Sequence, residues 1–291
     1  MLRQTGSPMA GRRQHYIPQM LLRRFADTNG AVMVIRTDGS RFSAKTKNVA
    51  LETDFHGTPG DGTTDEAITR EETKIWKVLC KLVECPEGTV DCVDAATVLS
   101  HFYTRSAAWR SQTATMVDTV VGVIRAKLDA SDQARDPSFQ LITSLAFSRL
   151  EKLVPTRIVD AHNALLKKEP TPAQRATSYS KFRYVVQDFD VALVLGDSIA
   201  WGASVGTRGI PLVEHDDSVE YVVFPLSVKR CLIGSRGSQP LLEADDIIAG
   251  SFAASSEFVV VHPQSSGYDE LVPTMGSGMR ELSERLRRKV T

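Results

Sequence analysis

The spacing of hydrophobic positions divides the chain of 291 residues into three parts. Near the start, Ile17, Leu21 and Phe25 recur every four residues, which predicts a short helix that buries one face. Pro18 suits the first turn of that helix, because a backbone N–H group would have no helical partner there. Residues 31–44 then read as two strands around a tight turn, so we expect a β-hairpin after the helix.

The middle part, residues 65–168, has mostly helical spacing. We expect one long helix over 94–129, and breaks at Pro137 and Pro155 that begin two further helices. From 178 to 291 the period becomes that of strands. The elements expected in this last part are strands at 182–186, 191–195, 220–224, 230–233 and 258–261, and helices at 243–254 and from Leu282 to the C-terminal end.

Strand-rich ends around a helical middle predict an α+β fold, in which an N-terminal β-hairpin and a mostly antiparallel C-terminal sheet surround the helices. We expect a disordered basic arm at 1–13 and a single α+β domain at 14–291. The glycine-containing segment 201–209 reads as a loop. If the hairpin packs beside the C-terminal sheet, His15 and Asp197 come together.

Composition and charge narrow the functional classes. The 35 basic and 35 acidic side chains cancel, so the chain as a whole does not attract nucleic acid or an anionic membrane. No apolar run reaches the ~20 residues of a membrane-spanning helix, and the N-terminus lacks the apolar stretch of a secretory signal. A cytoplasmic protein without membrane contact is expected. The four cysteines lack the paired spacing of zinc ligands, so we expect reduced, structural thiols.

The opening segment, residues 15–25, reads HYIPQMLLRRF. It resembles the start of a bacterial family called domain of unknown function 4238, whose pattern is roughly HYxPQxxLRxF. Weaker likenesses to the same family follow in the same order at Glu66 and Glu72, at 105–111, at Asp197 within the turn 195–199, and at 224–227. The resemblance extends over nearly the whole chain, but the family name implies no reaction.

Polar residues near these motifs are the candidates for chemistry. A histidine beside a helix N-terminus can act as an acid or base, a metal ligand or a phosphate partner, which makes His15 the first candidate. Asp197 follows a strand, where functional side chains are often held on a rigid base. With Glu72 these two residues would form an oxygen and nitrogen site for Mg²⁺, Mn²⁺ or Zn²⁺. Arg110 could stabilise developing negative charge.

Two functions remain open from the sequence. The first is a metal-assisted hydrolase, such as a nuclease, that acts on a phosphodiester or nucleotide. In it His15, Asp197 and Arg110 are catalytic, and His15, Glu72 and Asp197 hold a divalent metal. The second is a non-catalytic binding or regulatory protein, in which the set around His15 and Asp197 is a structural brace. The neutral charge weighs against a nucleic-acid partner, and the distances between these side chains discriminate between the two functions.

Overall fold

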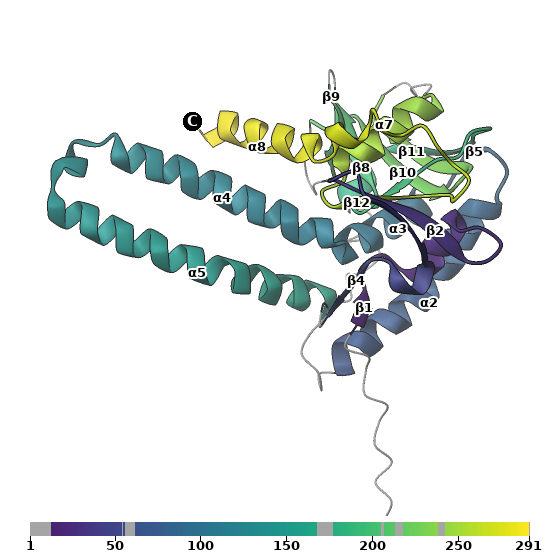
Figure 1. Ribbon diagram of the computed structural model, residues 1–291, viewed down its shortest axis with the longest axis horizontal. Helices are drawn as coiled ribbons and strands as arrows, with labels where there is room; N and C mark the ends of the chain where they lie inside the picture. Colours follow the sequence, from purple (N-terminus) through teal and green to yellow (C-terminus); the bar gives the residue numbers. More distant parts are fainter. Residues whose placement is uncertain are drawn as a thin grey trace, which may run out of the picture.

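The computed structural model describes residues 13–53, 55, 62–167, 177–204, 207–212, 218–237 and 242–290. The predicted arm at 1–13 lies outside this range except for Arg13. The chain forms a mixed α+β fold, as expected, with small N-terminal sheets, a helical middle and a C-terminal antiparallel sheet. Figure 1 shows a body of sheets and helices from which one pair of helices projects.

The strands form three sheets in the described part of the chain. Two short strands near the start pair with each other, and longer sheets have the strand orders β3-β2-β12-β7 and β5-β6-β11-β10-β8-β9. Every pairing among them is antiparallel. The bounds are β1 (Arg13–His15), β2 (Ala31–Arg36), β3 (Arg41–Lys45), β4 (Leu51–Thr53), β5 (Gly88–Thr89), β6 (Arg183–Asp188), β7 (Leu195–Gly196), β8 (Trp201–Ser204), β9 (Thr207–Pro211), β10 (Tyr221–Ser227), β11 (Arg230–Ser235) and β12 (Phe258–Val261).

The four-stranded sheet joins the two ends of the chain. The predicted hairpin is present as β2 and β3, and β12 pairs with β2 on one side and with β7 on the other. Val259 lies opposite both Ile35 and Gly196. All four side chains of β12 are buried, as its uninterrupted Phe-Val-Val-Val sequence favours for a central strand. The hairpin and β12 therefore belong to one sheet. This is a closer association than the predicted packing of the hairpin beside the C-terminal sheet.

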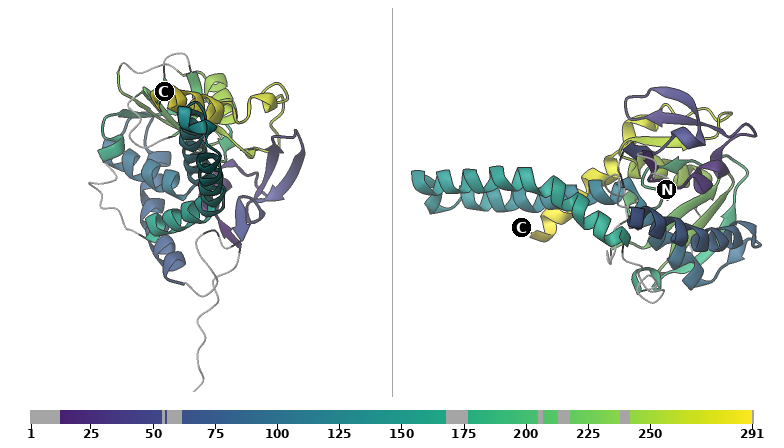
Figure 2. Two further views of the ribbon diagram at one scale, coloured as in Figure 1. Left: turned by 90° about the vertical axis from the view of Figure 1, so that its left-hand side faces the viewer. Right: turned by 90° about the horizontal axis from the view of Figure 1, so that it is seen from below.

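The helices frame these sheets and build the projection. Their bounds are α1 (Gln19–Leu22), α2 (Gly62–Glu84), α3 (Cys92–Arg105), α4 (Ala107–Asp129), α5 (Pro137–Lys167), α7 (Ala244–Ala254) and α8 (Ser277–Val290), with 3-10 turns η1 (Arg23–Phe25), η2 (Thr46–Asn48), η3 (Asp132–Arg135) and η4 (Val272–Thr274). The antiparallel α4 and α5 project from the body side by side, as Figure 2 shows from below. No helix in the described part of the chain is long and apolar enough to cross a membrane.

Two predictions about helix breaks are wrong. The long helix expected over 94–129 is divided at Ser106, whose extended backbone (φ −69°, ψ 147°) ends α3 and begins α4. Conversely, Pro155 lies inside α5 instead of starting a new helix. Proline removes one helical N–H donor, but Pro155 and Glu151 are exposed, so water can satisfy the carbonyl group that loses its partner.

Two predictions about strands are also corrected. The strand expected at 191–195 shrinks to β7, and the loop expected at 201–209 is the pair β8 and β9. The reason is packing around Trp201, which is buried and donates from its indole N–H to Ser251 Oγ at 3.1 Å. A Cβ atom on Gly250 would lie only 2.3 Å from the Trp201 ring, so α7 can approach this strand only with glycine there.

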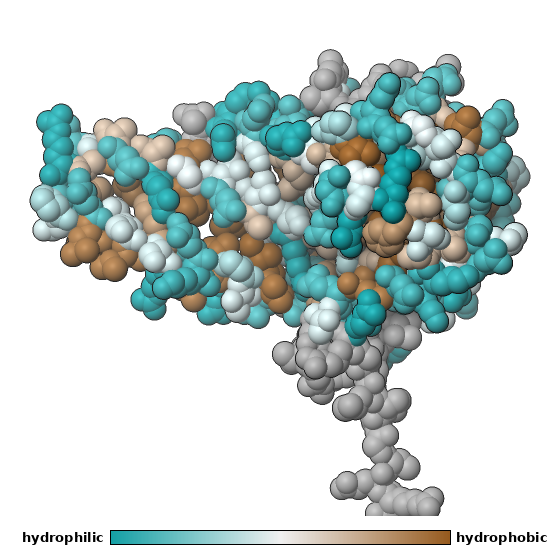
Figure 3. Space-filling model, in the orientation of Figure 1, coloured by the Kyte–Doolittle hydropathy of each residue, from teal (hydrophilic) through white to brown (hydrophobic). Residues whose placement is uncertain are grey.

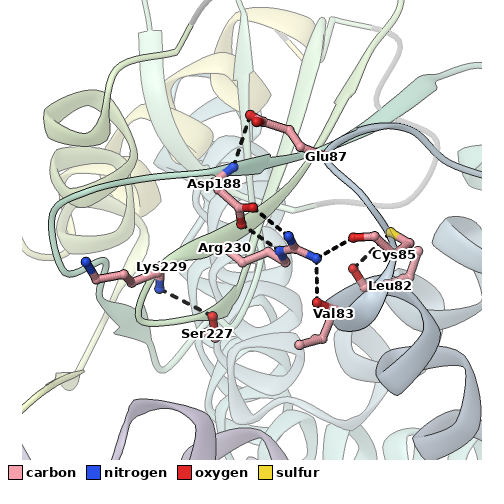
Figure 4. A network of polar contacts seen from close by, with 8 residues as sticks. All are labelled: Leu82, Val83, Cys85, Glu87, Asp188, Ser227, Lys229 and Arg230. Atoms are coloured by element: carbon pink, nitrogen blue, oxygen red, sulfur yellow. Dashed lines mark hydrogen bonds and ion pairs between the residues drawn. The ribbon is translucent and has the colours of Figure 1, made fainter.

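Arg230 fastens the six-stranded sheet to the end of α2 (Figure 4). Its Nε and Nη2 atoms donate to the two carboxylate oxygens of Asp188 at 2.6 and 2.5 Å. Its Nη1 atom donates to the carbonyl groups of Val83 and Cys85, the latter at 2.7 Å. The Asp188 N–H group donates to Glu87 at 3.2 Å. A planar guanidinium can serve this carboxylate and both carbonyl groups at once.

We predict that Arg230→Lys lowers the free energy of unfolding by about 1–2 kcal/mol, because lysine keeps the charge but loses the bidentate geometry. Urea denaturation followed by circular dichroism measures this change. Arg183→Lys is the matched control, since Arg183 is an exposed arginine on the neighbouring strand β6. Equal stability of the two variants would contradict the role assigned to Arg230.

Candidate functional site

The opening motif is held between the first and last parts of the chain by Tyr16. This side chain is buried, and its backbone N–H group donates to the Ala50 carbonyl at 3.0 Å. The Tyr16 ring lies 5.5 Å from the ring of Phe55 and 6.4 Å from that of Phe258, measured between centroids. Tyr16 therefore packs directly against the start of β12.

Asp197 binds the loop that precedes β12. Its carboxylate accepts hydrogen bonds from three consecutive backbone N–H groups, those of residues 256–258. The distances are 3.0 Å from Ser256, 2.6 Å from Glu257 and 3.3 Å from Phe258, and the Ser256 hydroxyl donates as well at 3.2 Å. The Asp197 N–H group donates to the Phe258 carbonyl at 3.2 Å. Both carboxylate oxygens are thus occupied by the protein itself.

Burial controls the ionisation of this region. It raises the pKa of Asp197 to about 6, although the N–H groups of Ser256 and Glu257 oppose the shift by stabilising the carboxylate. Burial also raises the pKa of Tyr16 far above its ordinary value, helped by the negative charges of Glu257 and Asp197. At neutral pH the aspartate is therefore ionised and fully bonded, while Tyr16 remains a neutral phenol.

The backbone beside the hydrogen bonds of Asp197 is strained. Ile199 has a φ of 65° and Ala50, which bonds to Tyr16, has a φ of 55°. Positive φ is rare for any residue except glycine and costs most for a β-branched one. Gly196 is required for another reason, since a Cβ atom there would lie 2.3 Å from Ser255 Oγ. The turn around Asp197 is therefore compressed against the end of α7.

His15 bonds to Val49 and Arg105, neither of which bonds to Asp197. Its Nδ1 atom lies 3.1 Å from the Val49 carbonyl oxygen and must carry the proton, because a carbonyl oxygen can only accept. The His15 carbonyl accepts from Arg105 at 2.9 Å, and Arg105 forms an ion pair with Glu72. Burial and then the nearby Arg105 lower the pKa of His15, while the bond to Val49 opposes them.

Arg110 forms four hydrogen bonds to partners within the protein. Its Nε atom donates to His162 Nδ1 at 2.8 Å, and its Nη1 atom donates to Glu52 at 3.3 Å. Its Nη2 atom donates to the Phe55 carbonyl and, at 3.3 Å, to Asn163. The guanidinium carbon lies 4.0 Å from the centroid of the Phe55 ring, a cation–π distance. Arg110 links β4, α4 and α5.

His162 completes this link as a neutral imidazole. It lies against the Thr104 carbonyl, with Nε2 at 2.7 Å, and therefore donates from that atom while Nδ1 accepts from Arg110. The ring stacks on Trp109 at 4.9 Å and meets Phe55 edge-on at 5.5 Å. Burial lowers the pKa of His162 to about 4.

The structure does not assemble the predicted metal ligands. His15 and Glu72 are both bonded to Arg105, through a carbonyl and a carboxylate respectively, whereas the Asp197 carboxylate serves residues 256–258. Among the described residues, no group of three or more His, Cys, Asp or Glu side chains is placed to hold a metal ion. The four cysteines are free thiols, as expected. Of the residues predicted as catalytic, His15 and Arg110 therefore bond to protein groups on one side of Tyr16, and Asp197 bonds to protein groups on the other.

A cleft of about 600 Å³ opens beside Tyr16. Its lining includes two arginines, Arg13 and Arg36, and two carboxylates, Asp38 and Glu257. Sequence reasoning missed these residues. Glu257 could be recognised only as a turn residue before β12, because its fixed position depends on a carboxylate 60 residues earlier in the chain.

This fold and site define an α+β protein whose N-terminal motif is fixed to its last strands by a buried carboxylate. Residues 13–119 match the family model described as protein of unknown function (DUF4238). The match ends within α4, so it is shorter than the resemblance inferred from the motifs. Neither a curated protein nor a solved structure matches the chain in the same comparisons.

We predict that Asp197→Ala lowers the free energy of unfolding by at least about 3 kcal/mol, since it leaves several buried N–H groups without an acceptor. Chemical denaturation measures the loss. Asp190→Ala, which removes an exposed carboxylate from a nearby loop, should change stability little. If Asp197→Ala were as stable as the wild type, the hydrogen bonds between Asp197 and residues 256–258 would not stabilise the fold.

We predict acid destabilisation through His162. Its pKa is about 4 in the folded protein against 6.5 ordinarily, so the unfolded chain binds more protons between these values. The contribution is complete above the ordinary pKa and falls by up to about 3 kcal/mol as the pH drops toward the folded value. Denaturation between about pH 7 and about pH 4.5 should show a smaller decrease for His162→Gln than for the wild type or His262→Gln. Parallel curves for all three proteins would refute this assignment.

Proposed function

We propose that this protein acts by binding a small anionic ligand, such as a nucleotide, in the cleft beside Tyr16. The observation that carries the proposal is that both carboxylate oxygens of Asp197 and most N–H groups of Arg110 are bonded to protein partners. Groups bonded in this way hold a scaffold in place, whereas a catalytic group must be available to the reacting atoms. The binding alternative from the sequence is therefore favoured over the hydrolase.

The chemistry of the cleft supports an anionic ligand with a hydrogen-bond donor. Arg36 and Arg13 can bind phosphate or carboxylate oxygens, and Glu257 can accept from an amine or hydroxyl. The guanidinium carbon of Arg36 lies 5.1 Å from the centroid of the Phe42 ring, so the cleft lining also includes an aromatic side chain. A nucleotide combines these features, because it carries phosphate, donor groups and a base that can stack.

The hydrolase prediction has less support. Its three expected metal ligands do not form a metal-binding group in the described part of the chain. His15 remains its best candidate, because an imidazole can act as an acid or base. Turnover of a phosphodiester would have to use an arrangement other than the one predicted.

Isothermal titration calorimetry with nucleoside mono- and diphosphates tests the proposal. We expect binding by the wild type, and at least a tenfold higher dissociation constant (about 1.4 kcal/mol) for Arg36→Gln, which removes one of the two positive charges of the cleft. Arg183→Gln removes an exposed charge outside the cleft and should bind like the wild type. No binding, or equal binding by both variants, would contradict the proposal.

A parallel assay addresses hydrolysis. The wild type and His15→Ala are incubated with nucleotides and single-stranded nucleic acid in the presence of Mg²⁺, Mn²⁺ or Zn²⁺. We expect no turnover that depends on His15. Metal-dependent turnover that His15→Ala abolishes would restore the hydrolase hypothesis.

A further inference from the structure

The projecting helices form an arm with two apolar faces. We define the arm as residues 118–160, the outer parts of α4 and α5 with the turn between them. On the inner face, Phe147 and Ile158 are buried, and Arg125 of α4 lies over the Phe147 ring at 4.4 Å. α8 packs against α4 near the body, where Figure 1 shows it on the side away from α5. The outer face of α5 has no such cover from α8.

That outer face is strongly apolar. Leu141, Ile142 and Leu145 are 62, 65 and 63% exposed. They lie two to six residues from the inward Phe147, which places them roughly 140–240° around the helix from it. Further exposed apolar side chains on the arm are Val120, Ile124, Leu150, Leu153 and Val159. In Figure 3 brown side chains gather along the arm. A patch of this extent marks an interaction surface on a protein in water.

The charges on the arm are segregated along its length. The tip, residues 129–136, carries three aspartates and one arginine. The shaft, residues 118–128 and 137–160, carries five basic and three acidic side chains. The tip is therefore net negative by two and the shaft net positive by two, and together they are neutral. Such an arm repels a parallel copy in register but attracts an antiparallel one, whose tip lies on its shaft.

We infer that this face binds a second copy of the same chain, with the two arms antiparallel and the outer faces of the two α5 helices packed together. An isologous two-fold contact needs a self-complementary surface, and this arm supplies an apolar face together with a negative tip and a positive shaft, each of which meets the other in the partner. Apolar residues spaced along neighbouring antiparallel helices are what such a contact buries. Neutral overall charge gives the arm no attraction for nucleic acid or anionic lipid.

The size of the outer face sets what a dimer can bury. α5 has 31 residues, so it is about 45 Å long at the usual rise per residue, and one helix face is about 10 Å wide. The area is on the order of 450 Å² per partner, at the low end of specific interfaces, which fits a dimer that forms at micromolar concentration.

Sedimentation equilibrium of the full chain tests the inference. The monomer mass is 32.0 kDa, so we expect a species of about 64 kDa at micromolar concentration. Replacing Leu141, Ile142 and Leu145 by glutamine should raise the dimer dissociation constant at least about a hundredfold and leave helix content unchanged, because these side chains are exposed in the monomer. Val191→Gln changes an apolar residue, 48% exposed, on the body and should leave the dimer intact.

A charge-reversal pair tests the antiparallel arrangement. Asp132→Lys with Asp136→Lys should weaken the dimer about tenfold, and adding Arg149→Glu with Lys152→Glu should restore it. A wild type that stays monomeric at about 100 µM would overturn the inference and leave the face for another partner. A dimer that survives the glutamine substitutions would place the interface elsewhere, and a failed charge rescue would exclude antiparallel arms.

Discussion

The Asp197 carboxylate and the three N–H groups that it accepts are the constraint on which the candidate site depends. Residues 256–258 leave α7 and enter β12, which is the strand between the N-terminal hairpin and β7. Removing a carboxylate from water is unfavourable unless hydrogen bonds replace the lost solvent, and here backbone groups fixed by the fold replace it. One charge thereby fixes where the last strand begins and where the Tyr16 ring can pack.

On the side of Tyr16 away from Asp197, Arg105 and Arg110 likewise hold separate segments of the chain together. Arg105 connects the His15 carbonyl to Glu72, and Arg110 connects β4 to both helices of the arm through Glu52 and His162. Each of these partly buried groups would destabilise the fold if it lost its hydrogen-bond partners, so the fold depends on these bonds being made together. This account explains why titratable residues cluster around the opening motif without converging on one reaction centre.

Local patterns predicted much of the fold but little of the site. The hairpin and β12 followed from alternation and turn residues, and α5 begins at Pro137 as its sequence indicates. Trp201 and Gly250 show why β8 was missed, since the glycine-containing segment packs against a helix 50 residues away. Likewise the prediction that His15 and Asp197 come together is met only in part. The two ends of the chain meet at Tyr16, which lies near Asp197, but the His15 side chain bonds to Val49 and its carbonyl accepts from Arg105.

Amide hydrogen exchange at Ser256, Glu257 and Phe258 tests the central claim most directly. If the Asp197 carboxylate holds these three N–H groups, their exchange in the wild type should be as slow as that of the β12 amides, and selectively faster in Asp197→Asn, in which one acceptor oxygen becomes a donor. Exchange of these amides at the rate of an exposed loop in the wild type would contradict the account.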